Sequence, residues 1–342
     1  MNIQENFSLK NYNTFGIDAW AKYFASITTI EELKESLEFK KPFTLSPLPS
    51  TLILGGGSNI LFTKKFEGLV LRNELKGFEI FGEDENNVFV KVAAGENWHQ
   101  FVRYCIHHSL AGVENLSLIP GSVGASPIQN IGAYGVEIKD VFHSLDAYHI
   151  NDKQIISFNA ADCDFGYRES VFKSKFKSQF VITEVTFRLR KKPIYNISYG
   201  AIEQELQSMG IVDLSLQAIS QAVINIRTSK LPDPAVIGNA GSFFKNPEIS
   251  SNEFHQLAQR FPGIVGYELP NENVKLAAGW LIEQCGWKGY RNGDAGCDAR
   301  QALVLVNYGN ATGSEIFNLS TSIIESVKEK FGAVLSREVN VV

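Results

Sequence analysis

The residues best suited to chemistry form one stretch between Ile119 and Glu137, which reads IPGSVGASPIQNIGAYGVE. Its glycines alternate with small hydroxyl and amide side chains, and no acidic or basic residue occurs before Glu137. Glycines let a ligand approach the backbone, while neutral hydroxyls and amides supply hydrogen bonds. The stretch therefore suits a phosphate or a heteroaromatic ring. A long surface loop with ordinary turn chemistry explains the glycines equally well.

A second cluster of small residues follows the short apolar run Thr51–Leu54. It consists of five consecutive residues, Gly55, Gly56, Gly57, Ser58 and Asn59. Consecutive backbone N–H groups in such a cluster can bind a pyrophosphate. No Gly-Lys-Ser/Thr follows, and the GxGxxG spacing is missing, so neither a Walker loop nor a Rossmann fingerprint is indicated. Taken alone, the cluster is a weak signal.

Three further clusters combine charge or hydroxyl groups with turn residues. Phe165–Ser170 contains Arg168, Arg227–Pro234 contains two cations, Arg227 and Lys230, and Asn239–Pro247 contains Ser242. Taken singly, surface salt bridges, a solvated face and a turn serine explain them. Ser242 is outside a G-x-S-x-G context and has no histidine near it in sequence, which disfavours a hydrolase nucleophile. A triad assembled from distant residues stays open.

Composition limits the classes of protein to consider. The chain has 342 residues, 44% of them hydrophobic and 20% charged, and a net charge of −5. These values are typical of a soluble globular protein of two or three domains, without the basic face of a nucleic-acid binder. The first residues, MNIQENFSLK, lack the pattern of an export signal, and no apolar run is long enough to span a membrane. We therefore expect a cytoplasmic protein.

The cysteines and histidines do not predict a metal site. The chain has four cysteines without a CxxC pair, which indicates free thiols in a reducing compartment. His107 and His108 are adjacent within an expected helix, so their side chains point in different directions. No set of residues has the spacing of metal ligands.

The apolar pattern predicts a mixed α+β chain with a boundary near residues 190–230. We expect strands at Thr51–Leu54, Val88–Val92, Leu145–Ile150, Gln154–Phe158, Phe180–Leu189 and Ala302–Asn307. Helices are expected at Glu31–Lys40, Trp98–His108, Leu214–Arg227, Leu276–Gln284 and Ser314–Phe331, the last ending at Gly332. The segment Gly238–Pro247 is expected to be a loop.

In order and in wording, these clusters resemble one family, the UDP-N-acetylenolpyruvoylglucosamine reductases of peptidoglycan synthesis. The matching pieces are Asn13–Gly16, Leu54–Asn59, Ala94–Trp98, Ile119–Glu137, Phe165–Ser170, Arg227–Pro234, Gly238–Pro247, Lys275–Trp280, Gln301–Asn307 and Arg337–Val339. They cover nearly the whole chain, and only four residues follow Glu338. The SPIQN wording and the Tyr199-Gly200 pair resemble the type I branch, in which a mobile tyrosine loop closes over substrate.

The resemblance implies an α+β architecture, with a two-lobed FAD-binding fold of the vanillyl-alcohol-oxidase/PCMH type and an α+β substrate-binding domain. The expected boundaries are residues 1–75 for the first lobe, with 332–342 packing near it, then 76–200 for the second lobe and 201–331 for the substrate domain. By the same resemblance, Gly55, Gly56, Gly57, Ser58 and Asn59 would hold the FAD pyrophosphate. Ser122, Ser126, Gln129 and Tyr134 would line the flavin. Neither cluster contains the histidine that attaches flavin in some relatives, so noncovalent FAD is expected.

Carried over residue by residue, the catalytic set is Arg168, Ser242 and Glu338. NADPH would reduce FAD, and hydride would then pass to the β-carbon of the enolpyruvyl ether. Arg168 would neutralise the developing carboxylate charge, and Glu338, if protonated, would donate a hydrogen bond to it. Ser242 would protonate the α-carbon. The UDP-sugar would be bound by Tyr199, Lys230, Asn246 and Gln301, with Arg227 as a further neighbour.

Two other functions stay open from the sequence. One is an FAD-dependent sugar or alcohol oxidase on the same fold, which the GSFFKNP segment and the missing attachment histidine disfavour. The other is a nucleotide-binding protein without redox turnover, which would take up no FAD. No nucleic-acid, membrane or metal partner is predicted, and the oligomeric state is left open.

Overall fold

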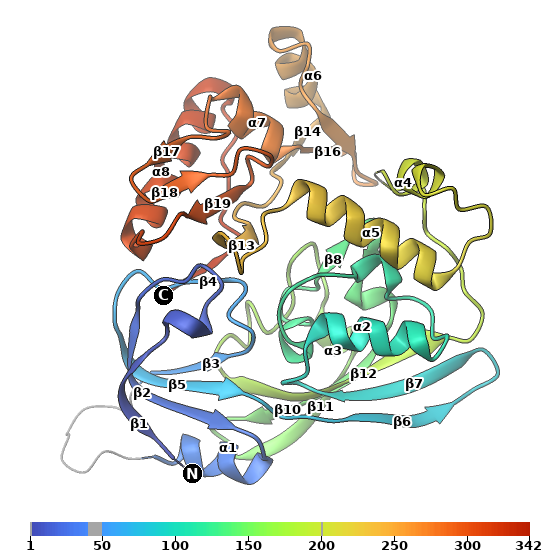
Figure 1. Ribbon diagram of the computed structural model, residues 1–342, viewed down its shortest axis with the longest axis vertical. Coiled ribbons are helices and arrows are strands. Elements are labelled where there is room, and N and C mark those ends of the chain that lie inside the picture. Colours follow the sequence, from blue (N-terminus) through green and yellow to red (C-terminus); the bar gives the residue numbers. More distant parts are fainter. Residues whose placement is uncertain (1, 40–49, 200) are drawn as a thin grey trace. The chain divides into compact units, whose positions relative to one another are not determined.

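The computed structural model describes residues 2–39, 50–199 and 201–342 and divides into two compact units. The first unit consists of Met1–Phe7, Ala21–Gly56 and Glu67–Ser229, and the second of Ser8–Trp20, Gly57–Phe66 and Lys230–Val342. In Figure 1 the colours follow the chain, so most of the second unit is orange and red. The two units are described separately.

The larger sheet of the first unit is antiparallel and has the strand order β11-β10-β12-β7-β6. Its strands are β6 (Phe78–Glu83), β7 (Asn87–Ala93), β10 (Phe142–His149), β11 (Gln154–Asn159) and β12 (Phe180–Arg190). In β7 the residues Val88, Val90 and Val92 are buried and alternate with partly exposed ones. Such alternation directs every second side chain to one face of the sheet. Figure 1 shows α2 (Trp98–His107) lying over that sheet.

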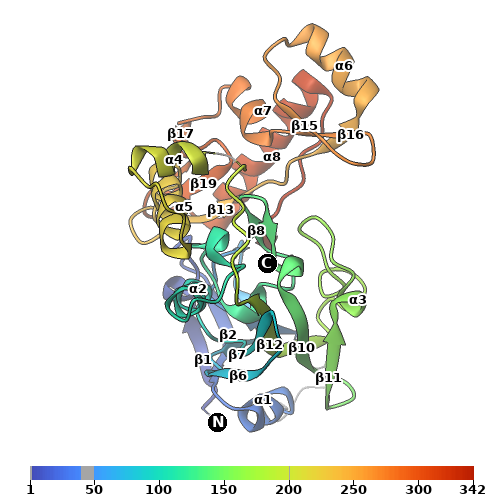
Figure 2. The same ribbon diagram turned by 90° about the vertical axis from the view of Figure 1, so that its right-hand side faces the viewer.

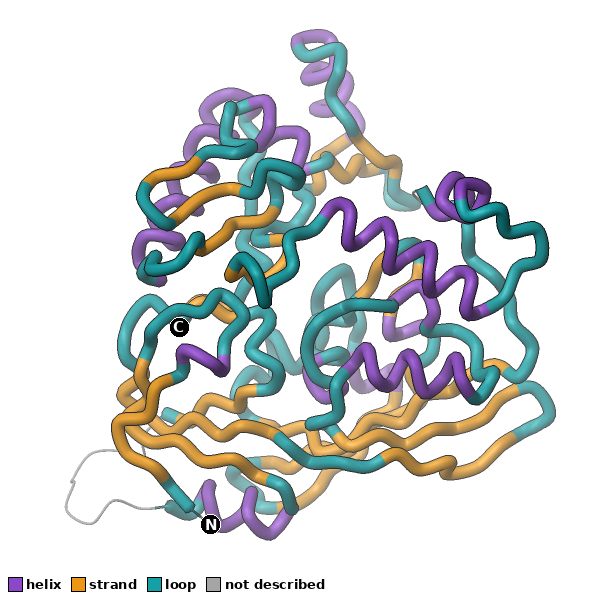
Figure 3. Tube along the Cα trace, in the orientation of Figure 1, coloured by secondary structure: helices purple, strands orange, loops and turns teal. Residues whose placement is uncertain are grey.

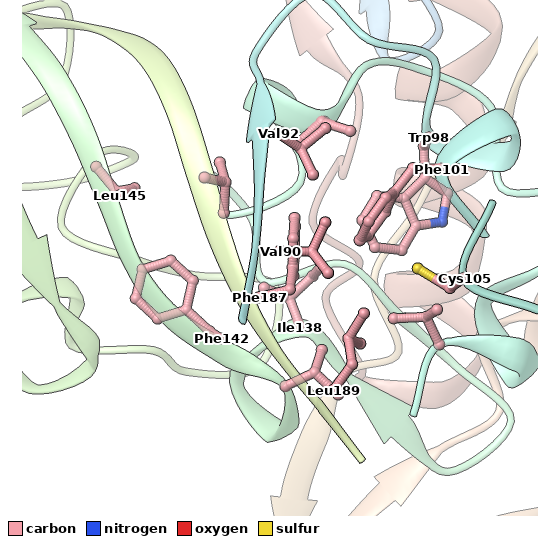
Figure 4. Close-up of a cluster of buried hydrophobic side chains, with 14 of the residues drawn as sticks. Val90, Val92, Trp98, Phe101, Cys105, Ile138, Phe142, Leu145, Phe187 and Leu189 are labelled. Carbon is pink, nitrogen blue, oxygen red and sulfur yellow. The ribbon is translucent and has the colours of Figure 1, made fainter. Parts of the chain in front are cut away.

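The core beneath α2 is aromatic. Trp98 and Phe101 are fully buried and contact Phe187 of β12, with ring centroids 5.8 and 4.6 Å from it. Figure 4 shows these rings beside Val90 and Cys105. The indole Nε1 of Trp98 donates a hydrogen bond to the carbonyl of Leu116 at 2.9 Å, so burial leaves no polar atom of this ring unsatisfied.

The second sheet of this unit has the order β1-β2-β5-β3. Its strands are β1 (Gln4–Ser8), β2 (Trp20–Ile27), β3 (Thr51–Leu54) and β5 (Phe66–Asn73), with β3 and β5 parallel. Helix α1 (Ile30–Leu37) begins after Thr29, whose side chain accepts a hydrogen bond from the Glu32 backbone N–H. Its Leu33 packs against Tyr23 and Leu71 of the sheet.

Further helices and several short elements complete the first unit. They are α3 (Ala160–Cys163), α4 (Ile202–Ser208), α5 (Leu216–Lys230, whose last residue belongs to the second unit), η2 (Glu114–Leu116), η3 (Val123–Ala125), η4 (Ile138–Asp140) and the hairpin β8 (Gly132–Ala133)–β9 (Val136–Glu137). Helices α4 and α5 share an apolar cluster, against which Tyr134 packs. Figure 2 shows α4 and α5 together.

The second unit is built on a sheet with the order β13-β19-β18-β17. Its strands are β13 (Gly238–Ser242), β17 (Arg291–Asn292), β18 (Ala295–Cys297) and β19 (Val304–Asn307), accompanied by α7 (Ala278–Gln284) and α8 (Gly313–Phe331). Figure 3 shows the separate small sheet of β14 (Glu248–Ser250), β15 (Gly266–Glu268) and β16 (Asn273–Leu276), which adjoins α6 (Ser251–Arg260). The remaining elements are η1 (Lys10–Tyr12) and the parallel pair β4 (Ile60–Leu61) and β20 (Asn340–Val341).

Most of the expected elements are present within a few residues of their expected ends, and one expectation is wrong. Part of the expected loop Gly238–Pro247 is the strand β13, because its backbone pairs with β19 despite two glycines. The expected helix Leu276–Gln284 begins only at Ala278, since Leu276 ends β16. Lys40 and Gly200 lie outside the described residues. The three-part domain division with boundaries at residues 75, 200 and 331 stays a prediction.

Within the described ranges, no helix is both long and apolar enough to cross a membrane. The same ranges contain no group of three or more His, Cys, Asp or Glu side chains arranged to hold a metal ion. Burial raises the pKa of Cys163 and Cys297 to about 12, so these thiols stay protonated near neutral pH.

Candidate functional site

Two glycine clusters that are distant in sequence meet in the first unit. A Cβ at Gly55 would overlap the hydroxyl of Ser122, and one at Gly56 would lie 2.9 Å from the Cα of Gly121. Only glycine permits this close approach of the two backbones. The structure thus brings Gly55, Gly56 and Ser122 together, as a shared ligand would require.

The stretch Ile119–Glu137 ends in the β8–β9 hairpin, whose two turn residues are both left-handed. Tyr134 has φ 50° and Gly135 has φ 79°, as a two-residue hairpin turn of the primed type requires. For a bulky residue such as Tyr134 this conformation is strained and needs support from its surroundings. Asn115 provides part of that support, because its Nδ2 donates to the carbonyl of Tyr134 at 2.9 Å.

Asn130, at the middle of the same stretch, is fully buried and joins it to the Arg168 loop. Its Nδ2 donates to Glu137 Oε2 and to the carbonyl of Gly166, both at 3.0 Å. Its Oδ1 accepts from the Lys139 backbone N–H at 3.1 Å. One side chain therefore holds the segment that carries Arg168 beside the glycine stretch.

Arg168 itself lies against this stretch in a left-handed conformation, with φ 56°. Its Nη2 donates to the carbonyl of Gly132, and its Nη1 is 3.9 Å from Glu137 Oε1. The side chain is 19% exposed. A cation in this position is held by the protein yet remains accessible to a ligand.

Tyr134 and Arg227 form a partly buried pair at the same place. Burial lowers the pKa of the Arg227 guanidinium, and the neighbouring Tyr134 opposes that shift. Burial raises the pKa of the Tyr134 phenol, while Arg227 opposes it by charge and by a hydrogen bond. Arg227 Nε is buried without any hydrogen-bond partner. An unsatisfied buried donor beside a glycine-rich loop fits a polar group of a ligand, and the resemblance expects the UDP-sugar near Arg227.

Three other residues expected near the flavin lie in the same stretch. Ser122 and Ser126 are buried, and Ser126 Oγ donates to the carbonyl of Val123 at 2.7 Å. The hydrogen of Ser126 is therefore used within the loop, which leaves its oxygen lone pairs for a ligand. Gln129 is partly exposed.

In the second unit, Ser242 lies at the end of β13 after a bulge. The register of β13 against β19 shifts between Asn239 and Ser242, and Gly241 in between has φ 69°. A bulge turns the following side chain away from the direction that regular pairing would give it. Thr14 fixes the start of the bulge, because its Oγ1 donates to the carbonyl of Asn239 at 2.6 Å.

Glu338 is tied to the segment that follows Ser242. Its backbone N–H donates to the carbonyl of Phe243 at 2.8 Å. Asn59 Nδ2 contacts the Glu338 carbonyl at 3.4 Å, and the Asn340 N–H donates to the Asn59 carbonyl at 3.2 Å. The second unit thus brings Ser242, Glu338 and Asn59 into one neighbourhood, whereas Arg168 belongs to the first unit.

The residues expected to bind the UDP-sugar are distributed over both units. Asn246 and Gln301 gather at the start of α7, since Asn246 Oδ1 accepts from the Ala278 N–H at 3.0 Å and Gln301 Oε1 faces Gly279. Lys230 ends α5 and is exposed. Tyr199 is 54% exposed and adjoins Gly135 in the first unit. Gly57, Ser58 and Asn59 follow one another before β4 in the second unit.

Sequence reasoning missed the amide side chains that position these groups. Asn115, Asn130 and Asn239 are buried and bind backbone carbonyls or N–H groups. Asn130 and Asn239 lie within the sequence motifs, but the motifs assign them no role. An asparagine next to glycines is itself a usable signal, because it tolerates the left-handed conformation and can hydrogen-bond the backbone locally.

Comparison with known proteins identifies both parts of the chain. Residues 21–157 match the FAD binding domain, and residues 233–342 match the C-terminal domain of UDP-N-acetylenolpyruvoylglucosamine reductase. Reductases of that name from Flavobacterium johnsoniae and Amoebophilus asiaticus are 52% and 50% identical, each over 100% of both chains. The enzyme from Pseudomonas aeruginosa is 46% identical over 99% of both chains.

The fold agrees with these matches. The crystal structure of the reductase from Thermus caldophilus superposes with a TM-score of 0.70, covering 100% of this chain and 99% of the other, at 24% identity. The expected α+β architecture with an FAD-binding domain is confirmed. The expected FAD-dependent oxidoreductase is confirmed as well. The chain belongs to the UDP-N-acetylenolpyruvoylglucosamine reductase family.

Proposed function

We propose that this protein reduces the enolpyruvyl ether of UDP-N-acetylenolpyruvoylglucosamine to UDP-N-acetylmuramate in the cytoplasm, with NADPH as the reductant, as a step of peptidoglycan synthesis. The observation that carries the proposal is 52% identity to a reductase of that name over the full length of both chains. The glycine stretch with Arg168 in the first unit supports it chemically, and so does the Ser242–Glu338 neighbourhood in the second unit.

The chain's own residues supply binding and electrostatics, and FAD, when bound, accepts hydride from NADPH and delivers it to the substrate. Gly55 and Gly56 present their backbone beside Ser122, a surface without charge that suits a cofactor phosphate or ring edge. Arg227 offers its free Nε, and Tyr134 fixes the guanidinium from one side. These residues bind and orient; they do not take part in electron transfer.

Arg168 serves the step in which charge develops on the substrate carboxylate. Hydride addition at the β-carbon moves negative charge to the α-carbon and the carboxylate oxygens. A guanidinium that is already held by Gly132 and Glu137 can stabilise this charge with little reorganisation. Glu338, in its protonated form, donates a hydrogen bond to the same carboxylate.

Ser242 completes the reaction by giving its hydroxyl proton to the α-carbon. The bulge at Gly241 and the hydrogen bonds around Phe243 hold this serine in a fixed orientation. Tyr199, Lys230, Asn246 and Gln301 bind the uridine diphosphate end, with Arg227 as a further contact. Binding energy at that remote end orients the enolpyruvyl group for the transfer.

An anaerobic experiment with the purified protein tests the proposal in two steps. NADPH should bleach the flavin absorbance, and the enolpyruvyl substrate should then restore it. Ser242→Ala should keep NADPH-driven bleaching and slow the substrate-driven recovery by roughly 10²-fold, the usual scale for a positioned proton donor. Ser322→Ala, at an exposed position of α8, is the matched control and should behave as the wild type.

The other outcomes identify other functions. A protein that takes up no FAD would be a nucleotide-binding protein. Flavin that is reoxidised rapidly by oxygen but not by the enolpyruvyl substrate would indicate an oxidase. A Ser242→Ala protein that loses NADPH-driven reduction yet keeps normal recovery would overturn the role of this serine.

A further inference from the structure

Backbone hydrogen bonds hold the segment that contains Arg337 against the segment that follows β13. One bond lies before this residue and runs from the Lys245 N–H to the carbonyl of Ser336 at 2.9 Å. The other lies after it and runs from the Glu338 N–H to the carbonyl of Phe243 at 2.8 Å. Such a pair of bonds is one step of an antiparallel ladder. The place of Glu338 therefore depends on the place of Arg337.

The side chain of Arg337 fastens this ladder to helix α8. Its Nε donates to Ser320 Oγ and its Nη2 donates to Thr321 Oγ1, both at 2.7 Å. The guanidinium carbon lies 4.3 Å from the centre of the Phe317 ring, within the range of a cation–π contact. Burial lowers the pKa of this guanidinium, so the contacts with α8 replace part of its hydration. Three residues of one helix thus hold one side chain.

The two hydroxyl groups on α8 are oriented to accept from the guanidinium. Ser320 Oγ donates to the carbonyl of Phe317 at 2.6 Å, and Thr321 Oγ1 donates to the same carbonyl at 3.1 Å. Because each hydroxyl hydrogen is used within the helix, the oxygen lone pairs are left to accept from Arg337. A planar guanidinium has its donors in fixed directions and can meet both oxygens at once.

We propose that Arg337 is a positioning residue for the reduction, which fixes the neighbouring Glu338 by fastening its backbone to α8. This inference rests on the proposed function, in which protonated Glu338 donates a hydrogen bond to the substrate carboxylate. That hydrogen bond stabilises developing charge only while donor and acceptor keep the right geometry. Even a small misplacement of such a group slows a reaction strongly. Arg337 acts through the backbone of its neighbour.

Arg337→Met in the FAD-loaded protein is the main test, because methionine keeps an unbranched side chain over Phe317 and removes the donors to α8. Substrate-driven flavin reoxidation should slow about tenfold or more. NADPH-driven flavin reduction and the dissociation constant of UDP should stay unchanged. Lys328→Met is the matched control, since Lys328 is an exposed cation on the same helix. It should leave both half-reactions at the wild-type rate.

A double-mutant cycle separates positioning from a merely structural role. Glu338→Ala removes the carboxyl group, so in this background Arg337→Met should slow reoxidation no further. A structural role would give the same additional slowing in both backgrounds. Thr321→Val removes one of the two acceptors while keeping the shape of the side chain, and it should slow reoxidation about threefold by the same route. This milder variant serves as the test if Arg337→Met does not fold.

The outcomes distinguish this inference from the proposed function. Wild-type reoxidation in Arg337→Met, or equal slowing in both backgrounds, would overturn the positioning role and leave the reductase activity standing. Wild-type reoxidation in Glu338→Ala would remove Glu338 from the reaction, and the role of Arg337 with it. A wild-type flavin that the enolpyruvyl substrate does not reoxidise would overturn the proposed function itself.

Discussion

Two parts of the molecule that are expected to carry the chemistry are held mainly by different kinds of contact. In the stretch 119–137, the left-handed residues include Asn130 and Tyr134, and buried asparagine amides support them. In 238–247, all of which the structure describes, the left-handed residue is a glycine, Gly241. There most of the support comes from backbone groups, through the pairing of β13 with β19 and hydrogen bonds to Leu303, Ser336 and Glu338. The Asn239 amide adds one bond, which it accepts from the Gly241 N–H.

This difference determines which substitutions each part tolerates. A loop that depends on side-chain amides should lose stability when one amide is removed, even where the smaller side chain meets no steric clash. A segment that depends on backbone contacts should tolerate many side-chain changes. It should lose stability where a new Cβ would clash with a neighbouring backbone segment. Strained non-glycine residues also tend to occur where a ligand is bound, which agrees with the expected place of the flavin.

The largest effect is expected at Gly238, in the segment 238–247, which backbone contacts hold. A Cβ at this position would overlap the carbonyl of Phe15, and no flexible side chain can move away to accommodate it. Gly238→Ala should lower the free energy of unfolding by about 3 kcal/mol or more, measured by urea denaturation. Gly82→Ala is the control, because nothing lies within 4 Å of its Cβ position. Equal stability of the two variants would contradict the backbone-held description.

A smaller loss of stability is expected at Asn130, in the stretch 119–137, which asparagine amides support. Asn130→Ala removes three hydrogen bonds, which join this side chain to Glu137, to the partly buried Gly166 carbonyl and to the Lys139 N–H. We expect a loss of about 2 kcal/mol in the free energy of unfolding, together with weaker retention of FAD. Asn151→Ala, at an exposed turn, should change stability by less than about 0.5 kcal/mol. If Asn130→Ala were as stable as Asn151→Ala, side-chain amides would not support the loop.

The sequence predicted the regular elements better than the contacts between them. The strand expected at Phe180–Leu189 and the helix expected to end at Gly332 follow from local rules, and the structure has them as β12 and α8. Gly238–Pro247 was expected to be a loop, because its glycines are typical of turns and the pairing with β19 depends on residues some sixty positions later. Long-range pairing of this kind has no local signal.

In the candidate site, too, the sequence indicates some residues and not the contacts between them. Its reacting groups were identified from family motifs, and their roles stay predictions. Asn115 and Asn196 lie outside the strings that carry the resemblance, so no local pattern indicates their contacts. These contacts depend on three segments meeting, the helix η2, the turn of the β8–β9 hairpin and residues 194–199, and only the folded structure shows this meeting.

At Arg168 the expected effect is on catalysis rather than stability. Arg168→Lys keeps the charge but loses the planar fork that contacts the Gly132 carbonyl and faces Glu137 at the same time. Substrate-driven flavin reoxidation should slow about tenfold, which corresponds to about 1.4 kcal/mol. Stopped-flow absorbance should show NADPH-driven reduction at the wild-type rate. A lysine variant that reoxidises at the wild-type rate would show that charge alone is needed here.

The smallest effect is expected at His99, which joins α2 to the start of the glycine stretch. Its Nδ1 accepts from the Leu118 N–H at 2.9 Å, and Leu118 is left-handed with φ 58°. Burial lowers the pKa of His99, and the charges of Arg103 and Arg227 lower it further. The folded protein therefore binds the proton more weakly than the unfolded chain does.

The stability that neutral His99 provides is consequently present above the ordinary histidine pKa of about 6.5 and is lost as the pH falls below it. His99→Asn offers an amide oxygen in place of Nδ1 and does not titrate, so Tm should fall less between pH 7 and pH 5 in this variant than in the wild type. His255→Asn, at an exposed position of α6, should keep the wild-type profile. A His99→Asn protein with the full acid-induced drop in Tm would mean that protonation elsewhere weakens the fold. The loss of stability at acid pH would then come from groups other than His99, which binds the residue just before the glycine stretch.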